Sequence, residues 1–258
     1  MITAASNSRI KRLAQLNQKS KLRRTEDVFL AEGVKMFLEA PREQLQEVYV
    51  SESFLEKCSC REHLEEVGYE VVSDSVFSKI SDTCTPQGVL CVLKQFHYNI
   101  EEMLRDKAPL FLLLENIQDP GNLGTMLRTG EGAGVSGIIM SRDTVDLYNP
   151  KVIRSTMGSI YRVPFYYADD FAAAVHQVQQ AGVSVYAAHL RGKNSYACQD
   201  YTKGTAFLIG NEGNGLREET AELADCYIRI PMEGKVESLN AAVASSILMY
   251  EAHRQRAI

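Results

Sequence analysis

The sequence predicts an α/β protein whose larger part is built on a parallel sheet. In the second half of the chain, short apolar segments alternate with segments of helical periodicity, the pattern of strands joined by crossover helices. The segment 110–114 is almost wholly apolar, as is typical of a parallel strand buried on both faces. A polar stretch precedes it. We therefore expect a small α/β domain at 1–96, a linker at 97–108 and a larger domain at 109–258.

The smaller domain is predicted to combine helices with short strands. Ser6 or Asn7 can cap a first helix that runs through Leu16, and a second helix follows it. The later elements are a strand and turn at 29–33, a helix starting at 34–39, strands at 47–50 and 69–72 with a helix at 54–67 between them, and a strand at 88–93.

The larger domain is predicted to alternate between strands and helices. Strands are expected at 110–114, 137–140, 183–188, 206–210 and 227–230, and helices from about 122 and at 150–159, 169–181, 216–223 and 238–255. Ser238 is a good N-cap for the last helix. Because parallel sheets bind ligands outside the carboxyl ends of their strands, the loops at those ends are the first place to look for chemistry.

The charge is unevenly distributed along the chain. With 28 Lys and Arg against 33 Asp and Glu, the net charge is −5, which excludes a chain that is basic throughout. Met1 to Thr25, however, holds seven cations and no acid: Arg9, Lys11, Arg12, Lys19, Lys21, Arg23 and Arg24. This basic cluster is either an ordinary solvated helix or a patch that meets phosphate.

Cysteines, histidines and hydropathy narrow the class of protein further. None of the six cysteines forms a C-x-x-C pair, and the five histidines lack the spacing of a zinc site, so we expect no metal. No secretory signal opens the chain, and no run of about 18 apolar residues suggests a membrane span. The cytoplasm is therefore the expected compartment.

Three loops at strand ends carry the candidate chemistry. The first follows 110–114 and contains Asn122 and, six residues later, Arg128, which is either a surface charge or a functional cation. The second, 208–216, has three glycines in six residues around Glu212, which lets backbone N–H groups approach a ligand. The third, 228–244, places Asn240 at the start of the last helix.

A glycine fingerprint also occurs, as Gly132-x-Gly134-x-x-Gly137. A dinucleotide site needs this pattern to follow a strand and open a helix, so that phosphate meets a helix N-terminus. Here the pattern closes a predicted helix and opens a predicted strand, so the glycines are interpreted as turn and packing residues. A nucleotide-dependent oxidoreductase remains an alternative that rests on this pattern alone.

Taken together, these segments resemble the SpoU/TrmH branch of the SPOUT RNA methyltransferases. The matching motifs are Asn122–Thr129, Ile209–Gly215 and Ile230–Ala244, in that order. In the first half, Asn7-x3-Lys11, Phe29–Gly33 and Thr85–Val89 resemble the substrate-binding domain of the family, which has a ribosomal-protein-like α/β fold. The resemblance covers nearly the whole chain.

The resemblance implies methyl transfer from S-adenosylmethionine to a ribose 2′-hydroxyl of RNA by a homodimer. It also implies a trefoil knot formed by about residues 205–258, an exception to the rule that chains do not thread loops. The implied cofactor pocket contains Gly210, Asn211, Gly213, Ile230, Met232, Ser238 and Leu239, with His189 and Leu190 nearby. Ribosomal RNA is favoured over tRNA, because the extra domain resembles that of rRNA-directed relatives. A non-catalytic RNA-binding relative is a further alternative.

The resemblance assigns the catalytic role to Arg128. Because an arginine pKa lies above ~12, a general-base role is demanding, and we favour a clamp on the neighbouring phosphate that stabilises the developing alkoxide. Asn122 and Asn240 would orient Arg128 or the RNA, and Glu212 would hold Arg128 or a ribose hydroxyl. Phosphate contacts are expected from Arg9, Lys11, Arg12, Lys21, Arg23 and Arg24.

Overall fold

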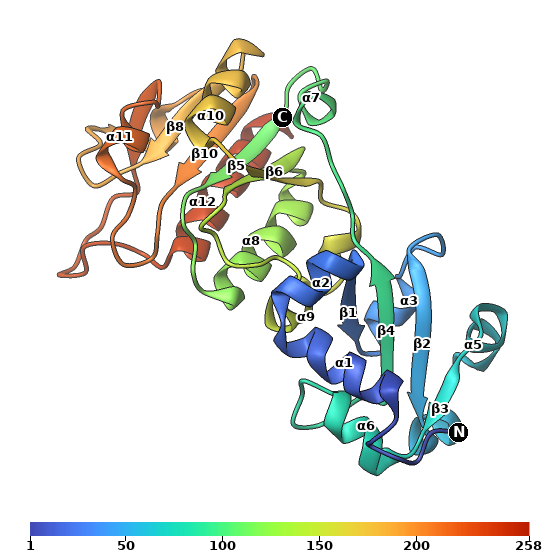
Figure 1. Cartoon of the computed structure of the whole chain (residues 1–258). Coiled ribbons are helices and arrows are strands. Elements are labelled where there is room, and N and C mark those ends of the chain that lie inside the picture. Colours follow the sequence, from blue (N-terminus) through green and yellow to red (C-terminus); the bar gives the residue numbers. More distant parts are fainter. Residues whose placement is uncertain (258) are drawn as a thin grey trace. The chain divides into compact units, whose positions relative to one another are not determined.

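The computed structural model describes residues 1–257, and its internal contacts divide the chain into two compact units (Figure 1). Unit 1 contains Met1–Phe96 and the later segment Asp146–Tyr161, and unit 2 contains the rest. No helix in the described part is both long and apolar enough to cross a membrane.

Unit 1 is built on a four-stranded mixed sheet in the order β1-β4-β2-β3. Its strands are β1 (Val28–Glu32), β2 (Leu45–Ser51), β3 (Glu70–Val72) and β4 (Val89–Lys94). Strand β4 is antiparallel to both β1 and β2, whereas β2 and β3 are parallel. Its helices are α1 (Ser8–Gln18), α2 (Ser20–Glu26), α3 (Val34–Leu38), α4 (Glu52–Lys57), α5 (Arg61–Val67), α6 (Asp74–Ile80) and α9 (Pro150–Thr156).

Helix α1 has the cap and the buried face that its sequence predicts. The Asn7 side chain accepts a hydrogen bond from the backbone N–H of Arg9, so Asn7 rather than Ser6 is the N-cap. Ile10, Leu13 and Leu16 are spaced three residues apart and are buried against the sheet together with residues of α6. The helix expected at 54–67 is instead two helices, because Cys58 takes an extended conformation (φ −70°, ψ 135°) and ends the first.

The segment Asp146–Tyr161 differs from the expected domain division, which placed it in the larger domain. The Asp146 carboxylate lies 2.5 Å from the Arg23 guanidinium, and the Tyr148 hydroxyl accepts a hydrogen bond from Phe96 N–H at 2.7 Å. The Tyr161 hydroxyl donates to the Met36 carbonyl at 3.0 Å. The segment was predicted to belong to the larger domain because in sequence it lies between two strands of the larger sheet. Its side chains nevertheless bind residues of unit 1.

Unit 2 contains a seven-stranded sheet in the order β7-β6-β5-β10-β8-β11-β9, and every pairing in it is parallel. The strands are β5 (Leu110–Leu114), β6 (Gly137–Ser141), β7 (Phe165–Ala168), β8 (Ser184–Ala188), β9 (Asn194–Ser195), β10 (Thr205–Ile209) and β11 (Cys226–Arg229). The five predicted strands are confirmed. Strands β7 and β9 were not predicted, because their four and two residues are too short for a pattern.

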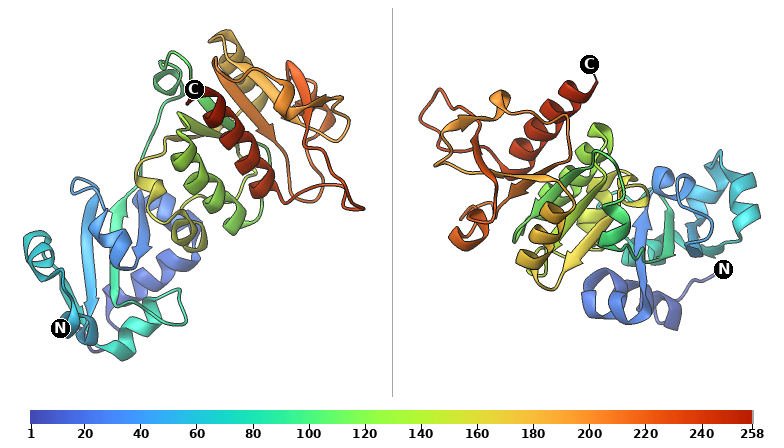
Figure 2. Two further views of the ribbon diagram at one scale, coloured as in Figure 1. Left: turned by 180° about the vertical axis from the view of Figure 1, so that it is seen from behind. Right: turned by 90° about the horizontal axis from the view of Figure 1, so that it is seen from above.

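Helices cover both faces of the large sheet: α7 (Ile100–Met103), α8 (Pro120–Ala133), α10 (Phe171–Gln180), α11 (Glu218–Ala221) and α12 (Ala241–Arg256). Helix α10 lies on one face, and α8 and α12 lie side by side on the other (Figures 1 and 2). Helix α8 ends at Gly134, which has a φ of +76°, and β6 starts at Gly137. The glycine fingerprint therefore closes a helix and opens a strand, as predicted.

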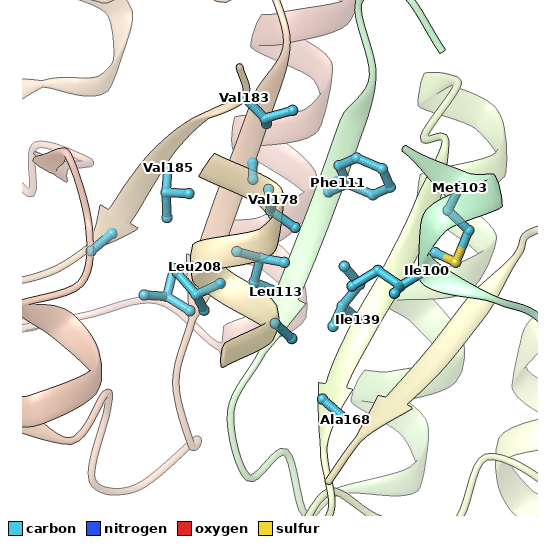
Figure 3. Close-up of a cluster of buried hydrophobic side chains, with 14 of the residues drawn as sticks. Ile100, Met103, Phe111, Leu113, Ile139, Ala168, Val178, Val183, Val185 and Leu208 are labelled. Carbon is cyan, nitrogen blue, oxygen red and sulfur yellow. The ribbon is translucent and has the colours of Figure 1, made fainter. Parts of the chain in front are cut away.

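The expected linker is in fact part of the core of unit 2. Ile100 and Met103 are buried with Phe111 and Leu113 of β5, as Figure 3 shows. Tyr98 and Leu104 pack against the same cluster and are partly buried. The polar residues between these apolar side chains made the segment look like a linker, but it is a packed part of unit 2.

Candidate active site at the strand ends

A cavity of about 310 Å³ lies at the carboxyl ends of β8, β10 and β11. Its wall is made by the loops that follow these strands and by the start of α12. All seven residues predicted for the cofactor pocket line it: Gly210, Asn211, Gly213, Ile230, Met232, Ser238 and Leu239. His189 and Leu190 line it as well. Residues from four separate segments are therefore brought to one place, as expected where parallel strands end at a common edge.

The loop after β10, residues 210–216 (hereafter the glycine-rich loop), folds back on itself. Asn211 and Gly215 exchange backbone hydrogen bonds of 3.0 and 2.9 Å, and the Asn211 side chain accepts from the N–H groups of Gly213 and Asn214. A Cβ atom at Gly210 would lie 2.2 Å from backbone atoms of Gly215 and Leu216. Glycine is required at position 210 because the loop closes directly over it.

Glu212, Asn122 and Asn240 form a hydrogen-bonded chain beside this cavity. The Asn122 Nδ2 group donates to Glu212 Oε1 at 3.0 Å, and the Asn240 Nδ2 group donates to Asn122 Oδ1 at 2.9 Å. These residues line an open groove that shares Asn211, Glu212 and Gly213 with the cavity wall. Three of the four residues predicted to be catalytic therefore meet, although they lie up to 118 positions apart in sequence.

The Glu212 carboxylate is anchored by the loop after β5. It accepts hydrogen bonds from the backbone N–H groups of Gln118 and Asp119, at 3.0 and 2.9 Å. Partial burial raises the pKa of Glu212, but the hydrogen bonds from Asn122 and from these two amides outweigh it and hold the pKa below its usual value. Sequence analysis missed the two amides, because backbone groups carry no residue signature.

Both asparagines lie at helix starts. Asp119 caps α8 by accepting from Asn122 N–H at 2.8 Å, with Pro120 in the first turn. Helix α12 is capped by Asn240 and not by Ser238, so that prediction was wrong: Asn240 Oδ1 accepts from Ala242 and Val243. Ser238 and Leu239 line the cavity ahead of the helix, which begins at Ala241. Capping fixes the Asn240 side chain and leaves its Nδ2 group for Asn122.

Arg128 is not part of this cluster. It lies on the exposed side of α8, and within residues 1–257 it makes no hydrogen bond or ion pair and belongs to neither cavity wall. The six positions between Asn122 and Arg128 correspond to a rotation of about 240° around the helix axis, so the two side chains leave α8 in different directions. Within one polypeptide chain, Arg128 therefore does not contact the hydrogen-bonded residues Glu212, Asn122 and Asn240.

His189 is held in one orientation at the cavity wall. Its Nδ1 atom accepts from Arg191 N–H at 3.1 Å, and its ring packs on Tyr227 with centroids 5.1 Å apart. Burial, and then the nearby Arg191 cation, lower the pKa of His189. The ring is therefore neutral near pH 7, and its proton resides on Nε2.

Three of the seven cations in the basic cluster of residues 1–25 are paired with acids of unit 1. Arg9 pairs with Glu70, and Arg12 pairs with Glu26 and Glu47, all within 2.8 Å. Arg23 is only 3% exposed and donates to the Leu16 carbonyl as well as to Asp146. The prediction that Arg23 binds RNA was therefore wrong, because its guanidinium is buried and bound to Leu16 and Asp146. The cations without a partner in the described residues are Lys11, Lys19, Lys21 and Arg24.

Comparison with known proteins matches both halves of the chain. The model of the SpoU rRNA Methylase family matches residues 109–250, and that of the MRM3-like substrate binding domain matches residues 7–91. The 23S rRNA (guanosine(2553)-2′-O)-methyltransferase RlmP of Bacillus subtilis (strain 168) is 32% identical over 252 residues, which are 96% of this chain and 97% of the relative.

Solved structures agree over the same length. The AdoMet-bound rRNA methyltransferase from Sinorhizobium meliloti superposes with a TM-score of 0.85 at 31% identity, covering 98% of this chain and 97% of that one. The SpoU methyltransferase AviRb from Streptomyces viridochromogenes, in complex with AdoMet, gives 0.88 at 26% identity, covering 97% and 98%. The family model, the full-length relative and the solved structures agree: this chain belongs to the SpoU family of S-adenosylmethionine-dependent RNA methyltransferases.

Proposed function

We propose that this protein methylates a ribose 2′-hydroxyl in ribosomal RNA. The observation that carries the proposal is that the cavity and the groove lie next to each other. Both are lined by Asn211, Glu212 and Gly213 of the glycine-rich loop. A ligand in the cavity can thus present a group to a ligand in the groove. Ribosomal RNA is favoured over tRNA because the full-length relative RlmP is named for 23S rRNA and because the match includes a substrate-binding domain.

The cavity suits the methyl donor in size and composition. Its volume of about 310 Å³ lies at the lower end of the range for small-molecule sites. Ile230, Met232 and Leu239 provide an apolar wall for the adenine ring, and the backbone of the glycine-rich loop lines the same cavity. When bound there, S-adenosylmethionine supplies an electrophilic methyl group on a sulfonium.

The residues of the chain would then prepare the nucleophile. A ribose hydroxyl attacks poorly until its proton is accepted, and the attack has to be in line with the S–CH₃ bond, so positioning is a large part of catalysis. Glu212 is ionised at neutral pH and fixes Asn122, which leaves the Asn122–Asn240 pair as a rigid edge for the RNA. Arg128 would clamp the phosphate and stabilise the developing alkoxide.

A homodimer would supply the missing arginine. Arg128 is exposed on α8, and the helix packed against it, α12, carries the exposed apolar side chains Val243 and Tyr250, which are 47% and 49% accessible. An exposed apolar face next to an unpaired cation is typical of a subunit interface. We therefore infer that Arg128 reaches the groove of the partner chain. Val243→Asp should turn the dimer into a monomer in analytical ultracentrifugation and abolish methyl transfer, and a monomeric wild type would contradict this.

Three further expectations belong to the same proposal. The C-terminal segment from about residue 205 is proposed to form the trefoil knot of the family. Unit 1 is proposed to bind RNA through its unpaired cations Lys11, Lys21 and Arg24, with Arg9 and Arg12 contributing only if RNA displaces their acidic partners. The cytoplasm, where rRNA is accessible, is the proposed compartment.

The direct test is methyl transfer from labelled S-adenosylmethionine to rRNA and to tRNA, followed by digestion to nucleosides. The expected product is a 2′-O-methylated nucleoside from rRNA alone. A methylated base, or label in tRNA only, would contradict the proposal. Binding of RNA and S-adenosylhomocysteine without any transfer would instead support a non-catalytic relative.

A further inference from the structure

Glu115 is a buried carboxylate for which the proposed reaction has no role. It is the first residue after β5 and is only 2% exposed. Its Oε2 atom accepts a hydrogen bond from Arg217 N–H at 2.9 Å, and its Oε1 atom accepts from the Thr220 hydroxyl and lies 3.7 Å from the Arg217 Nε atom. Burying a carboxylate is unfavourable unless it is well hydrogen-bonded, so this position calls for a specific explanation.

Both partners of Glu115 lie at the exit of the glycine-rich loop. Arg217 is the first residue after that loop and the N-cap of α11, and Thr220 is buried within α11. The Glu115 carboxylate therefore fixes the backbone at the point where the loop rejoins regular structure. The Arg217 guanidinium pairs with Asp143 as well as with Glu115, but its pair with Asp143 is about half exposed, whereas the backbone amide of Arg217 binds Glu115 alone.

The same short stretch after β5 also holds the rest of the glycine-rich loop. At the loop entry, the Asn211 side chain donates to the Asn116 carbonyl at 2.8 Å. In the middle, Glu212 accepts from the amides of Gln118 and Asp119. Glu115 is thus the third and most buried of three anchors that residues 115–119 provide. A loop with three glycines has many conformations available, so its shape depends on such anchors.

We propose that Glu115 is a positioning residue that sets the shape of the cofactor cavity by holding Arg217 N–H and the Thr220 hydroxyl. It touches neither the cofactor nor the RNA and acts through the glycine-rich loop. The inference rests on the proposed cofactor pocket. Its consequence is specific: loss of the anchor should weaken cofactor binding much more than it slows methyl transfer at saturation. Glu212, which fixes Asn122, keeps its own hydrogen bonds to the amides of Gln118 and Asp119, and Asn240 remains the cap of α12.

The test compares Glu115→Gln with wild-type full-length protein by calorimetric titration of S-adenosylhomocysteine and by steady-state kinetics. Glutamine has the same shape as glutamate, but its side-chain NH₂ group would face either Arg217 N–H or the Thr220 hydroxyl, and both of these are donors. We expect the Kd for S-adenosylhomocysteine and the KM for S-adenosylmethionine to rise about 10-fold, while kcat and the KM for RNA change less than about 3-fold. Thr220→Val, which removes one of the two contacts, should give a smaller rise in the same Kd.

Two controls make the outcomes distinct. Asp143→Asn removes the charge that pairs with Arg217, keeps a side-chain oxygen that can accept from Ser141, and should leave the Kd unchanged. Ala244→Leu places a larger side chain in the cavity wall and should weaken binding. If Ala244→Leu weakens binding but both Glu115→Gln and Thr220→Val bind normally, the inference on Glu115 is wrong, even if melting temperatures fall. If Ala244→Leu also binds normally, the proposed pocket is wrong. If Glu115→Gln does not fold, Thr220→Val alone decides.

Discussion

Two groups of polar residues stand out in this chain, and the fold treats them in opposite ways. At the strand ends of unit 2, Asn122, Glu212 and Asn240 come from three distant loops and bind one another beside a cavity. In the first two helices of unit 1, Arg12 and Arg23 bind acids from elsewhere in the fold, Glu47 and Asp146 respectively. Parallel topology makes strand-end loops converge, whereas nothing in a local run of cations reveals their distant partners.

The largest expected effect is the loss of kcat when Arg128, which lies outside the hydrogen-bonded group at the strand ends, is replaced. Arg128→Ala should lower kcat for methyl transfer by about 10²–10³-fold, because a charge-stabilising donor is lost. The Kd for S-adenosylhomocysteine should not change, since Arg128 is outside the cavity wall. Arg142→Ala, which removes another exposed arginine of unit 2, is the matched control and should retain activity. A fully active Arg128→Ala would refute the catalytic role.

The next effect tests whether Arg23 is structural. Arg23→Met should lower the free energy of unfolding by about 3 kcal/mol, because it leaves Asp146 and the Leu16 carbonyl without their donor inside unit 1. Urea denaturation measures this. Arg9→Met, which breaks the exposed pair with Glu70, should leave the midpoint unchanged. Equal stability of the Arg23 variant and wild type would mean that the buried pair contributes nothing.

A smaller effect is expected from the exposed cations of the same two helices. The double variant Lys21→Gln/Arg24→Gln should weaken RNA binding and reduce the slope of log K against log salt by about 1 for each cation that contacts phosphate. Stability should be unchanged, because neither side chain has a partner within residues 1–257. Lys79→Gln, on another helix of unit 1, is the control. An unchanged salt slope would place the RNA elsewhere.

The smallest expected effect is the pH dependence of Glu212. Its pKa is lower in the folded chain than the ordinary value of 4.5, so it stabilises the fold above about pH 4.5 and loses this contribution as the pH falls through the folded pKa. The difference in melting temperature between wild type and Glu212→Gln should therefore be greatest at neutral pH and shrink in acid. A constant difference from pH 7 to pH 3 would contradict the assignment.

Many helices, strands and loops of this protein could be predicted from sequence because each depends on a few adjacent residues. Apolar strands such as 110–114, the cap at Asn7 and the glycines around Glu212 each follow from the conformational preferences of a few adjacent residues. Since parallel strands end at one edge, the meeting of the three loops could also be anticipated. The seven predicted cavity residues depended on the family resemblance, and the structure places all of them in one wall.

Only the tertiary structure decided which groups are free. It assigned 146–161 to unit 1, packed Ile100 and Met103 into the core of unit 2, and buried Arg23 against Asp146. It also made Asn240 the helix cap that binds Asn122. The physical reason is common to all four: whether a side chain packs, pairs or remains exposed depends on partners far along the chain, and local sequence carries no record of them.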